Sequence, residues 1–184
     1  MDGELVTLSA ISTVNLREFL DGARLTVVLG VGSELRGDDA AGILVARRLA
    51  ESAMSLDVKS SGKGTPPKLV AIEGHTAPES FAGKIIKLKP SHVLIVDAAE
   101  MRLDPGGWEM LGRDELDKTI TTTHLIPLTA LAKHLEDSCG CKVGFVGIQT
   151  GKCDVAVGVS APVLLAIDEI SDDIVHLMTE NRPK

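Results

Sequence analysis

Two kinds of hydrophobic pattern alternate along this chain. Short runs dominated by apolar residues are typical of buried strands, and they occur at residues 25–29, 68–73, 91–98 and 142–150. Between them lie longer stretches whose apolar residues recur every three or four positions, as in an amphipathic helix. These stretches predict helices at residues 38–54, at residues 79–87, from Pro127 onward and at residues 161–180. The alternation predicts βαβ units with parallel strands.

The remaining segments complete the predicted fold. Residues 108–111 predict a short edge strand, and Ser12 or Thr13 is a candidate cap for a short helix that ends before Gly22. We therefore predict a single domain over residues 1–184, with residues 1–24 as an N-terminal extension packed on the sheet. Its fold class is α/β: a three-layer α/β/α sandwich around a mostly parallel twisted sheet of about five strands.

A glycine turn and two carboxylates follow the first strand. The turn contains Gly30 and Gly32, and the next helix begins at Asp38 and Asp39. A dinucleotide site would need a third glycine where Leu35 stands and a positive helix end facing the phosphates. Two carboxylates at that helix end repel an anion and suit a cation. A purely structural interpretation also exists, in which Asp38 caps the helix and Asp39 lies favourably in its first turn.

Further candidate residues lie at strand ends, where open α/β sheets collect their sites. Asp97 follows four apolar residues, a costly position unless the carboxylate is paired, caps a helix or binds a metal. His75 lies in the loop at the carboxyl end of the second predicted strand, and His124 precedes a predicted helix; such histidines are more often structural or exposed than ligands. Together Asp39, Asp97 and His124 offer oxygen and nitrogen donors that suit zinc, nickel and similar ions.

Composition excludes several classes of protein. The 184 residues carry a formal charge of −7 without a cluster of basic residues, which argues against a nucleic-acid partner. No apolar run approaches the ~18 residues of a membrane span, and the acidic N-terminus differs from a signal peptide. The three cysteines, Cys139, Cys141 and Cys153, lack zinc-finger spacing. We therefore expect reduced thiols in a cytoplasmic protein.

Five ordered motifs resemble the hydrogenase maturation proteases, the C-terminal processing endopeptidases of nickel-iron hydrogenase large subunits. They span about residues 25–180 and read VVLGVGSELRGDDAAG, GHTAPE, SHVLIVDAAEMRLDPG, TTTHLIPL and FVGIQT. The histidine motif resembles the formate-hydrogenlyase and archaeal branch. The chain departs from the family pattern at Ser33, Ala40 and His75, which replace Asn, Gly and Gly and affect the fine specificity of the predicted cleft.

The resemblance implies a set of site residues. It implies metal ligands at Asp39, Asp97 and His124, with the two aspartates also acting as the catalytic groups of an aspartic-type peptidase. It implies that Asp38 is a helix cap or a neighbouring group that supports these ligands. It also implies that Gly74 and His75 lie along the substrate cleft.

The implied reaction is the removal of the C-terminal extension from a nickel-loaded large-subunit precursor. Nickel would belong to the precursor, so no tightly bound cofactor is expected in the free, monomeric protein, although zinc or cadmium could substitute in vitro. A metal-activated water and a carboxylate general base both remain open as the means of attack. HExxH and GxSxG motifs are absent. The alternatives are a non-catalytic nickel-binding maturation chaperone and a phosphate- or nucleotide-binding domain.

Overall fold

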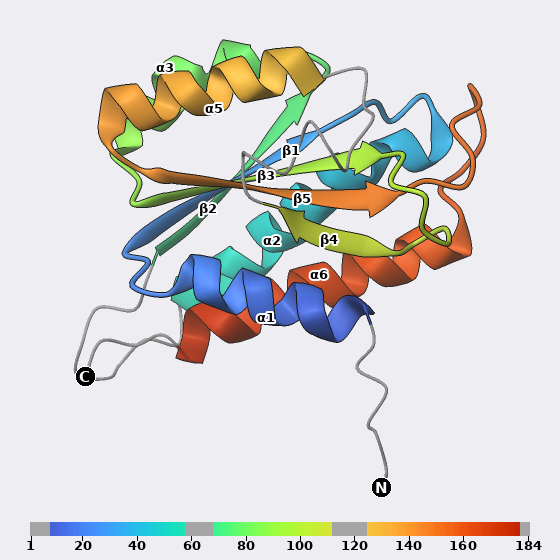
Figure 1. Cartoon of the computed structure of the whole chain (residues 1–184), viewed down its shortest axis with the longest axis horizontal. Coiled ribbons are helices and arrows are strands. Elements are labelled where there is room, and N and C mark those ends of the chain that lie inside the picture. Colours follow the sequence, from blue (N-terminus) through green and yellow to red (C-terminus); the bar gives the residue numbers. More distant parts are fainter. Residues whose placement is uncertain (1–7, 58–67, 112–124, 181–184) are drawn as a thin grey trace, which may run out of the picture.

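The structure, a computed structural model, contains a five-stranded sheet (Figure 1). The structure describes residues 8–57, 68–111 and 125–180 of the chain. The strands follow the order β2 (Lys68–His75), β1 (Leu25–Val31), β3 (His92–Ala99), β5 (Lys142–Gln149) and β4 (Trp108–Leu111). The first four are parallel, and β4 pairs antiparallel with β5 at one edge. The predicted mostly parallel sheet and its edge strand are confirmed.

Helices cover both faces of the sheet, so the predicted three-layer sandwich is confirmed (Figure 1). One face carries α1 (Leu8–Leu20), α2 (Ala41–Asp57) and α6 (Ala161–Glu180). The other carries α3 (Ala82–Leu88) and α5 (Leu125–Cys139). Two short 3₁₀ turns, η1 (Gly37–Ala40) and η2 (Pro78–Phe81), precede α2 and α3.

Two strands, β1 and β2, continue two residues beyond the predicted runs at residues 25–29 and 68–73. β1 continues through Gly30, which pairs with Val96, so the turn predicted at residues 30–32 begins only at Gly32. β3 agrees with the predicted strand at residues 91–98 to within one residue at each end, and Asp97, which ends its apolar run, lies inside the strand opposite Gly147. In each case a neighbouring strand supplies backbone partners, and pairing does not require an apolar side chain.

Helix starts also differ from the sequence prediction. α1 begins at Leu8, ahead of the predicted caps, and its Ser12 hydroxyl donates to the carbonyl of Trp108 in β4 (2.8 Å). α2 begins at Ala41, because residues 37–40 form the tighter turn η1. Among the described residues, no helix combines the length and apolar composition that a membrane span needs.

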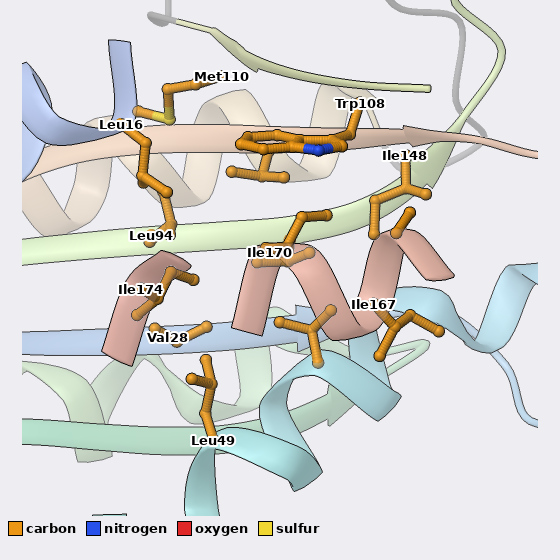
Figure 2. Packing of buried hydrophobic residues seen from close by; sticks show 14 of the residues in the cluster. Leu16, Val28, Leu49, Leu94, Trp108, Met110, Ile148, Ile167, Ile170 and Ile174 are labelled. Carbon is orange, nitrogen blue, oxygen red and sulfur yellow. The ribbon is translucent and has the colours of Figure 1, made fainter. Parts of the chain in front are cut away.

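The core consists of two layers, one on each face of the sheet. Successive side chains of the central strands point alternately into one layer and the other. Val28 and Leu94 point towards α1, α2 and α6, whereas Leu29 and Ile95 point towards α3 and α5. Figure 2 shows the first layer, in which the single tryptophan of the chain, 1% exposed, lies among aliphatic side chains. Burial on both faces explains why the central strands read as nearly continuous apolar runs.

A matched pair of substitutions in α6 tests this assignment of the core. We expect Ile170→Ala to reduce the free energy of unfolding by about 2–5 kcal/mol, because the fully buried side chain leaves a cavity. Leu165→Ala in the same helix, where the side chain is 70% exposed, should change it by no more than about 0.5 kcal/mol. Urea unfolding followed by circular dichroism measures both values. Equal losses would contradict the assignment.

Candidate active site

The amino end of α2 lies directly on the carboxyl ends of β1 and β3. A Cβ atom added to Gly42 would overlap the carbonyl oxygen of Val96 in β3 and lie 2.5 Å from that of Val31 in β1. A Cβ atom at Gly30 would overlap the carbonyl oxygen of Gly42. These glycines therefore allow backbone contact between helix and sheet, which accounts for the glycine pattern without a bound phosphate.

Asp39 lies in η1, at this contact between helix and sheet. Its backbone N–H donates to the carbonyl of Arg36 (3.1 Å), and its carbonyl accepts from the N–H of Ser33 (3.1 Å). Gly32, with φ of 132°, passes so close to this carbonyl that a side chain would overlap it. The loop leaving β1 thus fixes the backbone of Asp39, whose side chain is half-buried.

Asp97 lies near the end of β3, the strand that η1 contacts. It is only 5% exposed. Ile95 and Ala99, two positions before and after it, belong to the core layer under α3 and α5. Alternation along the strand therefore places Asp97 on the same face. The two predicted catalytic carboxylates, Asp39 and Asp97, come from adjoining elements at one edge of the sheet.

The predicted third ligand, His124, lies outside the described residues. The helix that follows it, α5, begins at Leu125 on the side towards which the arrows of β3 and β5 point (Figure 1). Within residues 8–57, 68–111 and 125–180, no group of three His, Cys, Asp or Glu side chains is arranged to hold a metal ion. The ligand set that includes His124 stays a prediction.

Asp38, beside Asp39, is completely buried and accepts four hydrogen bonds from the segment between β5 and α6. One carboxylate oxygen accepts from the N–H of Gly151 (2.8 Å), the N–H of Lys152 (2.9 Å) and the hydroxyl of Ser160 (3.0 Å). The other accepts from the N–H of Ser160 (2.7 Å). The backbone of Asp38 also donates to the carbonyl of Lys152 (2.9 Å).

These contacts decide the charge and the role of Asp38. Burial acts to raise its pKa, but the hydrogen bonds from Ser160, Lys152 and Gly151 outweigh burial and hold the pKa below its usual value. The interpretation in which Asp38 caps its own helix is wrong, because its carboxylate accepts hydrogen bonds from Gly151, Lys152 and Ser160 instead. These donors belong to the segment between β5 and α6, more than a hundred residues away in the sequence.

Gly74 and His75, the end of β2, border the same loop. Gly74 is buried, and a Cβ atom there would lie 2.8 Å from the side chain of Leu29. The carbonyl of His75 accepts a hydrogen bond from the N–H of Gly32 (3.1 Å), while its ring is exposed. His75 has φ of 51°, a conformation that favours glycine, which explains why the family pattern has glycine at this position.

Arg47 in α2 is an organising residue that the sequence analysis missed. Its guanidinium contacts Glu34 of the loop after β1 (2.6 Å) and makes two hydrogen bonds to Glu73 in β2 (2.6 and 3.1 Å). The bond from Arg47 lowers the pKa of Glu73. The helix spacing that identified α2 reveals none of these partners, because they lie on other elements.

Gln149, the last residue of β5, is a second organising residue that the sequence analysis missed. It is 3% exposed. Its side-chain oxygen accepts from the N–H groups of Met101 (2.7 Å) and Leu103 (3.2 Å), and its nitrogen donates to Glu100 (3.1 Å). Gln149 thereby fixes the chain that leaves β3 after Asp97. A polar residue ending a buried apolar run is the only sequence signal for it.

Three exposed apolar side chains lie beside η1. Leu35 and Val155 are each 74% exposed and Val157 is 40% exposed. The loops that carry them are joined, because the N–H of Ala156 donates to the carbonyl of Leu35 (3.0 Å). We name Leu35, Val155 and Val157 the apolar rim. Exposed apolar side chains that lie together are a feature of surfaces that bind another chain.

The sequence is similar to those of known proteins of one description. Residues 57–177 match the family described as hydrogenase maturation protease. The hydrogenase 3 maturation protease of Escherichia coli K12 is 33% identical over 145 residues, covering 78% of this chain and 85% of that protein.

Solved structures with the same arrangement belong to proteins of the same description. The nickel-iron hydrogenase maturation protease HycI of Thermococcus kodakarensis KOD1 aligns with a TM-score of 0.75 and 25% identity, over 89% of this chain and 97% of that one. The endopeptidase HycI of Escherichia coli aligns with a TM-score of 0.66 and 31% identity, over 80% of this chain and 87% of that one. This chain is a peptidase and belongs to the hydrogenase maturation protease family.

Proposed function

We propose that this protein removes the C-terminal extension from a nickel-loaded precursor of a nickel-iron hydrogenase large subunit. The observation that carries the proposal is the pair of carboxylates, Asp39 and Asp97, on adjoining elements at the carboxyl edge of the sheet. The chain belongs to a family of hydrogenase maturation proteases, and the edge that holds these carboxylates is where open α/β sheets bind their ligands.

The proposed nickel ligands are Asp39, Asp97 and His124, which would contact nickel that the precursor already carries. Two carboxylates and an imidazole suit a divalent transition metal, and zinc or cadmium could take the place of nickel in vitro. The start of α5 at Leu125 supports the choice of His124, because that helix begins at the same edge. Nickel is therefore part of the substrate in this proposal.

Coordination of the substrate's nickel would explain selectivity for loaded precursor. A precursor without nickel cannot supply the coordination that aligns its peptide bond with Asp39 and Asp97, so it loses binding energy that the loaded form has. The cleft would run past Gly74 and His75. The apolar rim is suited to contact apolar residues of the precursor beside the cleaved bond.

Two routes for attack on the amide are compatible with these carboxylates. A carboxylate can act as general base towards water, or the water can be activated by the metal. In both routes Asp39 and Asp97 must be ionised and held in place. Asp38 would serve them indirectly, since its bonds to residues 151–160 fix the turn that carries Asp39.

The proposal also covers the state of the free protein before it binds the precursor. We expect residues 1–184 to act as one domain and the free protein to be a cytoplasmic monomer. It would hold no metal tightly between reactions, because its ligands serve the nickel of the precursor.

Cleavage of a purified precursor tests the proposed reaction. We expect the protein to release one C-terminal fragment from nickel-loaded precursor and none from nickel-free precursor, as measured by intact-mass spectrometry. Asp39→Asn should slow cleavage at least about 100-fold, the usual contribution of a general base. Asp168→Asn is the matched control, because this carboxylate is exposed on α6 and should leave the rate unchanged.

Each contrary result has a clear meaning. Equal cleavage of nickel-free precursor would overturn the proposed role of nickel, and unchanged cleavage by Asp39→Asn would overturn the proposed site. If the protein cleaved no paired precursor but bound nickel tightly by itself, the nickel-binding chaperone would be the better assignment.

The structural role of Asp38 predicts a stability loss that depends on pH. At pH 7 we expect Asp38→Asn to reduce the free energy of unfolding by about 2–3 kcal/mol, because buried donors lose a charged acceptor. The same change at Asp168, on the surface, should cost about 0.5 kcal/mol or less. Chemical unfolding at a series of pH values measures both.

The direction of the pH effect follows from the lowered pKa of Asp38. A lowered pKa in the folded state stabilises the protein above the unfolded value of about 3.9, where Asp38 is ionised in both states. The difference between wild type and Asp38→Asn should therefore be constant above about pH 5. It should shrink as pH falls through 3.9 towards the lower folded-state pKa. A difference that grew in acid would contradict this role.

A further inference from the structure

Two of the three cysteines lie in contact at the edge of the sheet opposite the candidate active site. Cys139 ends α5 and Cys141 immediately precedes β5, and their sulfur atoms are 3.3 Å apart. Figure 1 shows this end of α5 on the side where β5 starts, away from the arrowheads of β3 and β5. The proposed peptidase reaction uses neither thiol, so the pair calls for a separate explanation.

The turn between the two cysteines holds the thiols towards each other. Gly140 has φ of 64°, and its N–H donates to the carbonyl of Glu136 (2.9 Å), which is the hydrogen bond that closes a helix at a left-handed residue. On the other side, the N–H of Lys142 donates to the carbonyl of Ser91 (2.9 Å). The backbone on both sides of the pair is therefore fixed by neighbouring elements.

The two thiols differ in accessibility. Cys139 is partly exposed, and its sulfur also contacts the carbonyl of Leu135 (2.9 Å), whereas Cys141 is 5% exposed. Burial and the contact with Cys139 raise the pKa of Cys141 to about 12, so its thiol stays protonated. A small oxidant in solution would reach Cys139 first, and Cys141 would be the nearest group to react with the product.

We infer that Cys139 and Cys141 are a redox pair that closes to an intramolecular disulfide when the protein meets a peroxide. The sulfur of Cys139 attacks one peroxide oxygen, the O–O bond breaks, and water leaves with the thiol proton to give a sulfenic acid. The sulfur of Cys141 then attacks the sulfenic sulfur, the S–O bond breaks, and a second water leaves with the second thiol proton. Two thiols lose two electrons in total, and the peroxide gains them.

The distance favours the disulfide over other products. The sulfur atoms need only approach from 3.3 Å to the disulfide length of about 2.05 Å. A second peroxide, or another protein molecule, would have to reach the sulfenic acid before a thiol already in contact with it. Because Cys141 is buried, pairing within the chain is also favoured over pairing between chains.

Peptide mapping of the full chain tests this inference. Native protein is treated with hydrogen peroxide, residual peroxide is removed, free thiols are alkylated, and the chain is digested with trypsin. Cleavage after Lys133 and Lys142 releases residues 134–142 as one peptide that contains both cysteines, while Cys153 falls in another peptide. We expect the first peptide to lose about 2 Da, to resist alkylation and to recover both thiols with dithiothreitol.

Single variants separate pairing from independent oxidation. Cys141→Ser should accumulate a sulfenic acid at residue 139 that dimedone traps, and Cys139→Ser should leave Cys141 open to alkylation after unfolding. Cys153→Ser, the matched control, should still form the bridge. Two alkylatable thiols after peroxide, a sulfinic acid on Cys139 beside a reduced Cys141, or a bridge to Cys153 would each overturn the inference. The wild-type digest alone decides the question should a variant fail to fold.

Discussion

A single buried carboxylate joins the beginning of this fold to its end. Asp38 lies in η1, after the first strand of the sheet, and accepts hydrogen bonds from residues 151, 152 and 160. Because its carboxylate is buried, these donors replace the solvation of the charge, and separating them would leave an uncompensated anion. The loop that carries Asp39, the segment that leads into α6 and the apolar rim between them all depend on this contact.

Close contact between α2 and the sheet brings together the two elements that carry Asp39 and Asp97. Gly30, Gly32 and Gly42 bring the start of α2 onto β1 and β3, so that the turn carrying Asp39 contacts the strand carrying Asp97. The two adjacent aspartates thereby acquire different roles. The Asp38 carboxylate accepts hydrogen bonds from residues 151, 152 and 160, whereas the side chain of Asp39 is only half-buried and is the one proposed to take part in the chemistry.

α5 links the candidate active site to the thiol pair. It begins one residue after His124 and ends at Cys139, at the opposite edge of the sheet. β5 returns from Lys142 to Gln149, whose side chain fixes the segment after β3. A disulfide between Cys139 and Cys141 would therefore join a helix and a strand that both lead to the proposed site, although the thiols themselves lie far from the catalytic edge.

The sequence by itself determined the layered fold, the order of most elements and the family, because hydrophobic periodicity reports which faces are buried and the motifs lie in order along the chain. It also placed Asp39 and Asp97 near the carboxyl ends of strands. Only the tertiary structure decided that β1 and β2 continue to Val31 and His75. It alone also decided that Asp38 bonds to the segment before α6 instead of its own helix, and that Arg47 joins Glu34 to Glu73. Those features depend on contacts between segments that are far apart in the sequence, and local patterns of polarity carry no information about such contacts.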